Sequence, residues 1–205
     1  MVNRTGDCTR WWKEFIVIEF KPLEQLNDNE IEVVAKSVCQ LDPLFYMQLS
    51  QDESECIAKV YRLIITSGTD LCVGDAAFYH GEFVGYSCYF PAKEKKFRSA
   101  TSLKILLDNK SAIEKKKIIS LATEFSKRVA PLETSGLYLN KIHAFKTNVG
   151  IGTALLNRFI ERASSGNTPC SLHVNKENEH AILFYQNNGF NMISSGSDYI
   201  LMTRG

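Results

Sequence analysis

The chain has 205 residues, of which 44% are hydrophobic and 23% are charged. This length supports one sizeable hydrophobic core, so we expect a single domain over residues 1–205, in which residues 1–12 could form a flexible tail. The formal net charge of +1 provides no overall field that would attract nucleic acid or an anionic membrane. We therefore expect neither as a partner.

The six cysteines form no C-x-x-C pair and show no zinc-ligand spacing. We therefore expect reduced thiols, no metal site and a cytoplasmic location. The N-terminal segment lacks the apolar run of a secretion signal, and no window approaches about eighteen uninterrupted apolar residues. The sequence therefore predicts neither secretion nor a membrane-spanning segment.

Apolar periodicity in the first third of the chain predicts one strand followed by two helices. The strand is expected at EFIVIEF, residues 14–20. Apolar residues at helical spacing predict the helices at about 29–40 and 53–65, and Pro43 ends the first of them.

The clearest hairpin of the chain comes next. The strand-like runs LCVGDAAFY and FVGYSCYF flank His80, Gly81 and Glu82. This short polar turn carries a glycine where a positive φ is often required. The two runs should therefore pair as antiparallel neighbours.

Residues 91–134 separate this hairpin from the remaining strands. The segment opens with PAKEKKFRSA, which we expect to be a basic loop, and continues with a helix from Ser111 to Ala130. It therefore predicts an insertion with one extra helix between the third and fourth strands. The rest of the chain alternates strand and helix, at 136–145, 150–164, 170–175, about 178–188, 189–194 and 198–203.

Two glycines, Gly150 and Gly152, lie where a strand leads into a helix. The first turn of a helix leaves up to about four N–H groups unpaired at its positive end, so a turn without bulky side chains admits an anion. By itself the pair more often marks a tight strand-to-helix turn. A dinucleotide fingerprint is excluded because Leu155 stands where a third glycine is needed, and no Walker sequence occurs.

A second cluster, LHVNKENEHAILFYQNNGF at 172–190, follows one helix and one strand later. It is similar to the N-x-x-A-x-x-F-Y-x-x-x-G-F segment of the GCN5-related N-acetyltransferase (GNAT) superfamily. Residues 136–163 resemble the strand, [QR]-x-x-G-x-[GA] loop and helix of the same family. Thr147 departs from that pattern, since Gln or Arg is expected there.

The resemblance implies an α/β fold with a mixed, mostly antiparallel sheet flanked by helices. It also implies an N-acetyltransferase that moves an acetyl or other short acyl group from acetyl-CoA to a primary amine, without a metal. The acceptor could be a small molecule or a protein amine. The alternative is a non-catalytic module that binds acyl-CoA as a sensor.

In the family, main-chain amides of the glycine loop bind the diphosphate of coenzyme A, and its pantetheine arm lies between the splayed fourth and fifth strands. The resemblance therefore assigns cofactor contacts to Ile142, Ala144, Thr147, Val149, Gly150, Ile151, Gly152, Thr153, Asn178 and Tyr185. Asn178 would either bind the pantetheine or cap the following helix.

Tyr185 matches the family residue that protonates the departing thiolate, although it could simply pack its helix on the sheet. A general base is harder to name. His143 is the leading candidate, with a structural role as the alternative, and His173 and Glu133 are further options. A water chain could also serve.

The basic residues of the insertion could receive an acidic acceptor or the ribose phosphate of the cofactor, or form a solvated face. They are Lys93, Lys95, Lys96, Arg98, Lys115, Lys116 and Lys117. The apolar segment DYILMT, residues 198–203, would permit a homodimer but also suits a buried terminal strand.

Overall fold

The structure is a computed structural model, and it describes residues 17–41, 43–46, 52–133, 135–146 and 149–205. The expected tail at 1–12 and the first part of the strand expected at 14–20 lie outside these residues. Thr147 also lies outside them.

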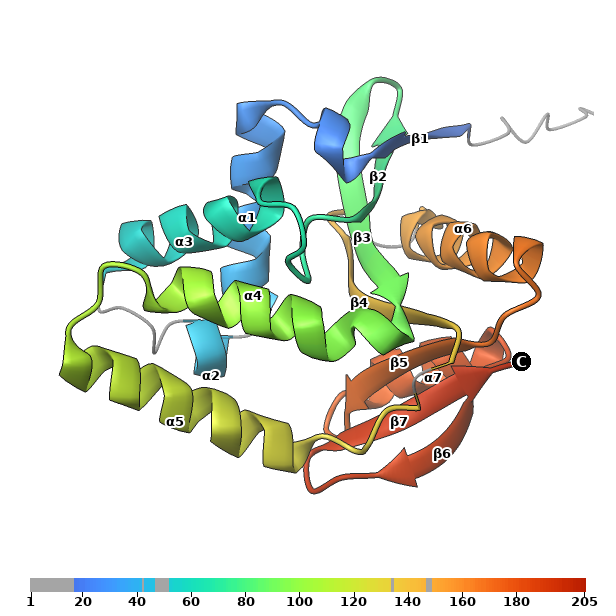
Figure 1. Ribbon diagram of the computed structural model, residues 1–205. Helices are drawn as coiled ribbons and strands as arrows, with labels where there is room; N and C mark the ends of the chain where they lie inside the picture. The colour runs from blue at the N-terminus through green and yellow to red at the C-terminus, as the bar shows by residue number, and fades with distance from the viewer. Residues whose placement is uncertain (1–16, 42, 47–51, 134, 147–148) are drawn as a thin grey trace, which may run out of the picture.

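The described residues form one seven-stranded sheet in the order β1-β2-β3-β4-β5-β7-β6 (Figure 1). Every neighbouring pair is antiparallel except β4 and β5, which run parallel. The expected mixed, mostly antiparallel sheet is therefore confirmed. The strands are β1 Ile18–Pro22, β2 Gly74–Tyr79, β3 Glu82–Pro91, β4 Leu137–Ala144, β5 Cys170–Asn175, β6 Asn191–Ser195 and β7 Tyr199–Arg204.

The helices expected from periodicity are found within about two residues of their predicted limits. None of the helices among the described residues is both long and apolar enough to cross a membrane. The α-helices are α1 Asp28–Leu41, α2 Pro43–Tyr46, α3 Glu53–Ile65, α4 Lys95–Leu107, α5 Ala112–Arg128, α6 Ile151–Ser165 and α7 Glu179–Asn187, with short 3₁₀ turns at Leu23–Gln25 and Ala92–Glu94.

The helices cover both faces of the sheet (Figure 1). Ala76 and Phe78 of β2 pack with the buried residues of α1 and α3, whereas Ala77 packs with α6 on the other face. This alternation follows from the two-residue period of a strand. All but the first residue of DYILMT lies in β7, which pairs with β5 on one side and β6 on the other, so it is an internal strand.

The insertion between β3 and β4 contains two helices, so the prediction of a basic loop at 91–100 was wrong. Only Ser102 and Leu106 of α4 are buried, which leaves a weak apolar pattern in the sequence. Tertiary contacts stabilise this helix at its C-terminal end, where the buried Lys59 Nζ donates to the carbonyls of Leu106 and Asp108, each at 3.2 Å. A cation on the last carbonyls of a helix satisfies groups that lack intrahelical partners.

The two parallel strands meet at one end and separate at the other. β4 and β5 pair only as far as Leu139 and Leu172, although β4 continues to Ala144 and β5 to Asn175. The β3 register shifts between Cys88 and Tyr89, so Asn140 is an extra residue in β4. The sheet is therefore open between β4 and β5 along their C-terminal halves.

Candidate active site

The N-terminus of α6 lies at the open end of β4. Gly150 precedes the helix with φ 77°, a left-handed conformation that favours glycine. The Ala154 N–H donates to the Gly150 carbonyl at 2.9 Å, which leaves the N–H groups of Ile151, Gly152 and Thr153 without intrahelical partners. No side chain of the described residues caps this end.

The first turn of α6 is also sterically accessible. A methyl group added at Gly150 would meet nothing within 4 Å, and one at Gly152 would meet only Phe184 Cζ at 3.9 Å and Ala144 Cβ at 4.0 Å. Ile151 is 1% exposed and fixes the turn in the core. This helix end can therefore accept an anion on its main-chain amides.

Two amides of β4 point toward the opening. The Phe145 N–H donates to the Val84 carbonyl of β3 at 2.9 Å. Because successive residues of a strand direct their N–H groups to opposite edges, those of Ile142 and Ala144 point away from β3 and toward β5. Since β5 does not pair at this level, both amides border the gap.

A cavity of about 470 Å³ occupies this gap, and Tyr185 of α7 lines it. The Tyr185 side chain is 8% exposed, and its hydroxyl makes no hydrogen bond with any other described residue. Burial raises the pKa of Tyr185, so the phenol stays protonated at neutral pH. A protonated hydroxyl with no hydrogen-bond partner among the described residues thus lies at the wall of the cavity.

Asn178 lies at the start of α7 and borders the same cavity. Its side-chain oxygen accepts a hydrogen bond from the Ala181 N–H at 3.0 Å, so it is the N-cap of the helix. Of the two roles expected for Asn178, the structure shows helix capping.

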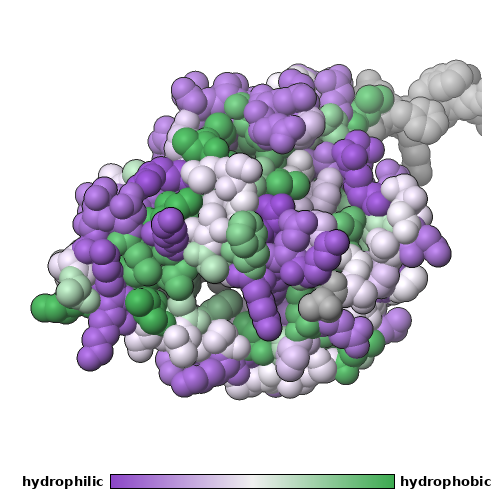
Figure 2. Space-filling model, in the orientation of Figure 1, coloured by the Kyte–Doolittle hydropathy of each residue, from purple (hydrophilic) through white to green (hydrophobic). Residues whose placement is uncertain are grey.

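A second cavity, of about 340 Å³, lies on the other side of the opening, beneath α4 and α5. Figure 2 shows the surface hollowed between these two helices. Helix residues contribute mainly apolar side chains, including Phe45, Leu63, Leu103, Leu106, Ala122 and Phe125. The sheet and the loop before β2 contribute polar ones, including Asp70, Tyr138, Asn140, Lys141 and His173.

The two cavities meet on the strands. Asn140, Lys141, His173 and Tyr199 line both of them. A ligand between β4 and β5 and a second ligand under α4 and α5 would therefore have adjacent ends. The extra residue of β4, Asn140, lies at this junction.

A chain of hydrogen bonds lies on the polar floor of the second cavity. His173 donates through Nε2 to the Ala130 carbonyl at 2.8 Å, which leaves Nδ1 as an acceptor for the Tyr138 hydroxyl at 3.1 Å. Lys95 Nζ lies 2.7 Å from the same hydroxyl. Burial, with Lys95 nearby, lowers the pKa of His173 to about 4, and burial lowers that of Lys95 to about 8.

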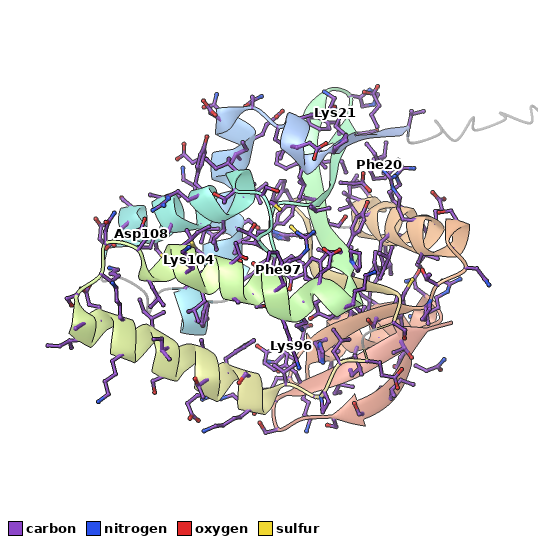
Figure 3. The ribbon with its side chains drawn as sticks, in the orientation of Figure 1. Phe20, Lys21, Lys96, Phe97, Lys104 and Asp108 are labelled. Atoms are coloured by element: carbon purple, nitrogen blue, oxygen red, sulfur yellow. The ribbon has the colours of Figure 1, made fainter. Side chains whose placement is uncertain are left out.

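The basic residues of α4 therefore have different surroundings. Lys95 lines the second cavity, whereas Lys96 and Phe97 are exposed (Figure 3). Arg98 is bound to Glu94 in an ion pair of 2.7 Å. Of the two alternatives for this cluster, the solvated face does not apply to Lys95, because the helix directs this side chain into the cavity.

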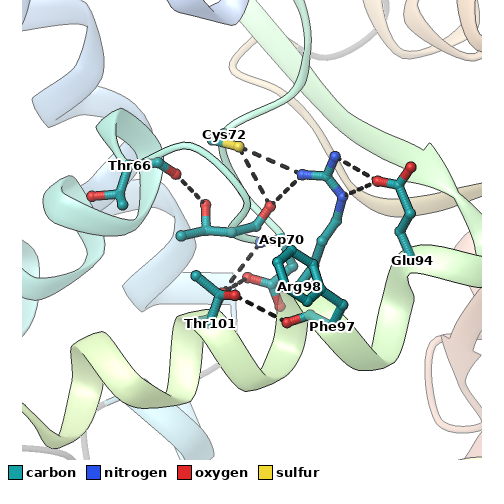
Figure 4. A network of polar contacts seen from close by, with 9 residues as sticks. Thr66, Asp70, Cys72, Glu94, Phe97, Arg98 and Thr101 are labelled. Atoms are coloured by element: carbon teal, nitrogen blue, oxygen red, sulfur yellow. Dashed lines mark hydrogen bonds and ion pairs between the residues drawn. The ribbon is translucent and has the colours of Figure 1, made fainter.

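Asp70 joins a polar network between the loop at 66–73 and α4 (Figure 4). The Ser102 hydroxyl donates to its Oδ1 at 2.5 Å, and Asn140 Nδ2 donates to its carbonyl at 2.8 Å. Burial raises the pKa of Asp70. Sequence reasoning missed this residue, since no motif surrounds it.

His143 lies apart from both cavities. It directs its ring toward α1, where Nδ1 lies 2.5 Å from Ser37 Oγ, and Ser37 Oγ lies 3.1 Å from the Tyr86 hydroxyl. Burial lowers the pKa of His143. The physical reason is strand alternation, because His143 stands between Ile142 and Ala144 and faces the opposite side of the sheet. The structure therefore does not bring His143 and Tyr185 together.

Glu133 is exposed and lines neither cavity. Within the described part of the chain, no three His, Cys, Asp or Glu side chains are grouped so that they could hold a metal ion.

Comparison with solved structures identifies the architecture. An N-acetyltransferase from Staphylococcus aureus Mu50 is similar with a TM-score of 0.66 and 15% identity, over 91% of this chain and 99% of the other. The chain has the GNAT acetyltransferase fold. The PaiA N-acetyltransferase from Thermoplasma acidophilum, solved in complex with coenzyme A, is also similar, with a TM-score of 0.50 and 16% identity over 92% and 99% of the two chains.

One region of the sequence also matches a family model of acetyltransferases. Residues 143–190 match the model of the acetyltransferase (GNAT) family. This region contains the glycine turn, α6, β5 and α7, which are the elements around the first cavity. No curated protein gives a significant match to the chain.

Proposed function

We propose that this chain is an N-acetyltransferase that transfers an acetyl or other short acyl group from acetyl-CoA to a primary amine in a ternary complex. The observation that carries the proposal is the meeting of two cavities where β4 and β5 separate. The first cavity, between β4 and β5, suits the acyl donor, and we call it the donor cavity. The second cavity, beneath α4 and α5, suits the amine acceptor, and we call it the acceptor cavity. The GNAT fold and the family match at 143–190 support this assignment.

The residues present fit coenzyme A. The N–H groups of Ile151, Gly152 and Thr153, which have no partner within the helix, would bind the diphosphate, together with the main chain of Val149 and Gly150. The Ile142 and Ala144 amides would pair with the pantetheine arm as a strand would. Thr147 stays a proposed contact, since it lies outside the described residues. When bound, acetyl-CoA would supply the thioester that is attacked.

In the proposed reaction, the acceptor nitrogen forms a bond to the acetyl carbon while the carbon–sulfur bond breaks. The acceptor first gives an ammonium proton to the neutral amine of Lys95, which replaces His143 as our proposed base because it lines the acceptor cavity. The Tyr185 hydroxyl gives its proton to the departing sulfur, and the second proton that the nitrogen loses as the amide forms restores the Tyr185 hydroxyl. An N–H group of β4 stabilises the charge that grows on the carbonyl oxygen.

The test of this function is thiol release from acetyl-CoA when primary amines are added. We expect acetyl-CoA to raise the melting temperature and at least one amine to release free thiol with formation of an amide, measured by mass spectrometry. Stabilisation by acetyl-CoA without thiol release across small amines, polyamines and lysine peptides would favour the acyl-CoA sensor instead.

Lys95→Met should remove the pH dependence of the proton-transfer step. The neutral form of Lys95 is the base, so kcat at saturating amine should rise with pH through about 8, the pKa that burial gives this lysine. The variant should have a kcat lowered roughly a hundred-fold and no inflection near that pH.

The neighbouring Lys96→Met is the matched control, because Lys96 is exposed on the same helix. It should keep the wild-type profile. An unchanged inflection in Lys95→Met would remove Lys95 from the role of base.

A further inference from the structure

The acceptor cavity has two chemically different sides. Its helix side is apolar and partly aromatic, with Phe45 and Phe125 from α2 and α5 and Leu103 from α4. Its sheet side carries the charged and hydrogen-bonding groups near the junction with the donor cavity. A molecule that fills it well has a polar end at the junction and an apolar body beneath the helices.

Asp70 gives the polar side a group that suits a cation. Its Oδ1 is bound by Ser102, whereas its Oδ2 makes no hydrogen bond to another described residue. The backbone N–H of Asp70 also donates to Ser102 Oγ at 3.2 Å, so this one hydroxyl bridges the backbone and the carboxylate of Asp70. Burial raises the pKa of Asp70, and the Ser102 hydrogen bond and the nearby charge of Lys141 act in the opposite direction.

We propose that the acceptor is a small primary amine with an apolar or aromatic body, and that the Asp70 carboxylate binds its ammonium group. This inference rests on the proposed function and names the substrate class of the same site. Lys95 can then take a proton from the ammonium group that Asp70 holds. The cavity volume of about 340 Å³ lies at the lower end of the range for small-molecule sites.

Two other amine classes fit less well. A polyamine would carry further ammonium groups to the apolar helix side of the acceptor cavity, where desolvation of a charge is costly. An amino acid would add a carboxylate close to that of Asp70. The comparison of 2-phenylethylamine with L-phenylalanine isolates that carboxylate, and the comparison with spermidine tests the additional charges.

The experiment measures kcat/KM for these three amines and the affinity of 2-phenylethylamine by calorimetry in the presence of coenzyme A. We expect 2-phenylethylamine to be preferred by at least about ten-fold. Asp70→Asn keeps the size of the side chain, and it should raise the KM and Kd of this amine roughly ten- to a hundred-fold. The affinity for coenzyme A should stay unchanged.

Asp108→Asn is the matched control, since Asp108 lies at the exposed end of α4 (Figure 3). It should leave kcat/KM for every amine, and the KM and Kd of 2-phenylethylamine, unchanged. Ala122→Leu places a larger side chain of α5 on the apolar helix side of the acceptor cavity. It should weaken the binding of 2-phenylethylamine and leave the binding of ethylamine unchanged.

The outcomes separate the inference from the function. Preference for spermidine or L-phenylalanine, or unchanged amine constants in Asp70→Asn, would overturn the inference while acetyl transfer stands. Asp70-dependent binding of 2-phenylethylamine without any thiol release would support the binding site and count against the transferase. Absence of 2-phenylethylamine binding and turnover, with transfer to a lysine peptide, would assign the cavity to a protein acceptor and overturn the inference.

Discussion

Gly152→Asp should lower the affinity for coenzyme A by at least about a hundred-fold without destabilising the fold. The new carboxylate would lie at the first turn of α6, where we place the diphosphate, and like charges about 4 Å apart repel by several kcal/mol in a partly exposed site. The positive end of the helix dipole stabilises a carboxylate in the first turn. Aspartate also has a higher helix propensity than glycine. The free energy of unfolding should therefore stay equal or rise.

Gly152→Ala is the control for this substitution. Its methyl group would make only ordinary contacts, at 3.9 Å to Phe184 and 4.0 Å to Ala144. Calorimetric titration of coenzyme A into both variants should show binding by the alanine variant and little or none by the aspartate variant. Equal affinities in the two would mean that the diphosphate binds elsewhere.

Tyr185→Phe should lower turnover about a hundred-fold or more while leaving the Kd of acetyl-CoA within about three-fold of wild type. The substitution removes the hydroxyl that we propose as the proton donor, on a residue that lines the donor cavity. Because the hydroxyl makes no hydrogen bond to another described residue, its removal should leave the melting temperature unchanged.

Tyr79→Phe provides the comparison, because Tyr79 lies at the end of β2 and lines neither cavity. Its turnover should equal that of wild type. If Tyr185→Phe turned over as fast as Tyr79→Phe, Tyr185 would be a packing residue of α7 and another group would protonate the sulfur.

The sequence predicted the donor side of the candidate site because local patterns encode it. A glycine before a helix and an Asn N-cap leave signals within a few residues, and the structure contains both at Gly150 and Asn178. These features need no knowledge of distant contacts.

The acceptor side was less predictable because distant segments assemble it. Asp70 stands in a loop without a motif, and its role depends on Ser102 and Asn140, which lie far along the chain. Helix α4 was missed since contacts with Lys59 stabilise a weakly amphipathic segment. His143 was proposed as a base because its residue type suits the chemistry, but the direction of its ring depends on packing against α1.

The most direct measurement is the structure of the chain determined with coenzyme A. We expect oxygen atoms of the diphosphate within hydrogen-bonding distance of the Ile151 and Gly152 amides. The sulfur end should lie between β4 and β5, beside the Tyr185 hydroxyl. A diphosphate bound away from α6, or strands β4 and β5 closed over by side chains with the ligand on another surface, would contradict the proposed site.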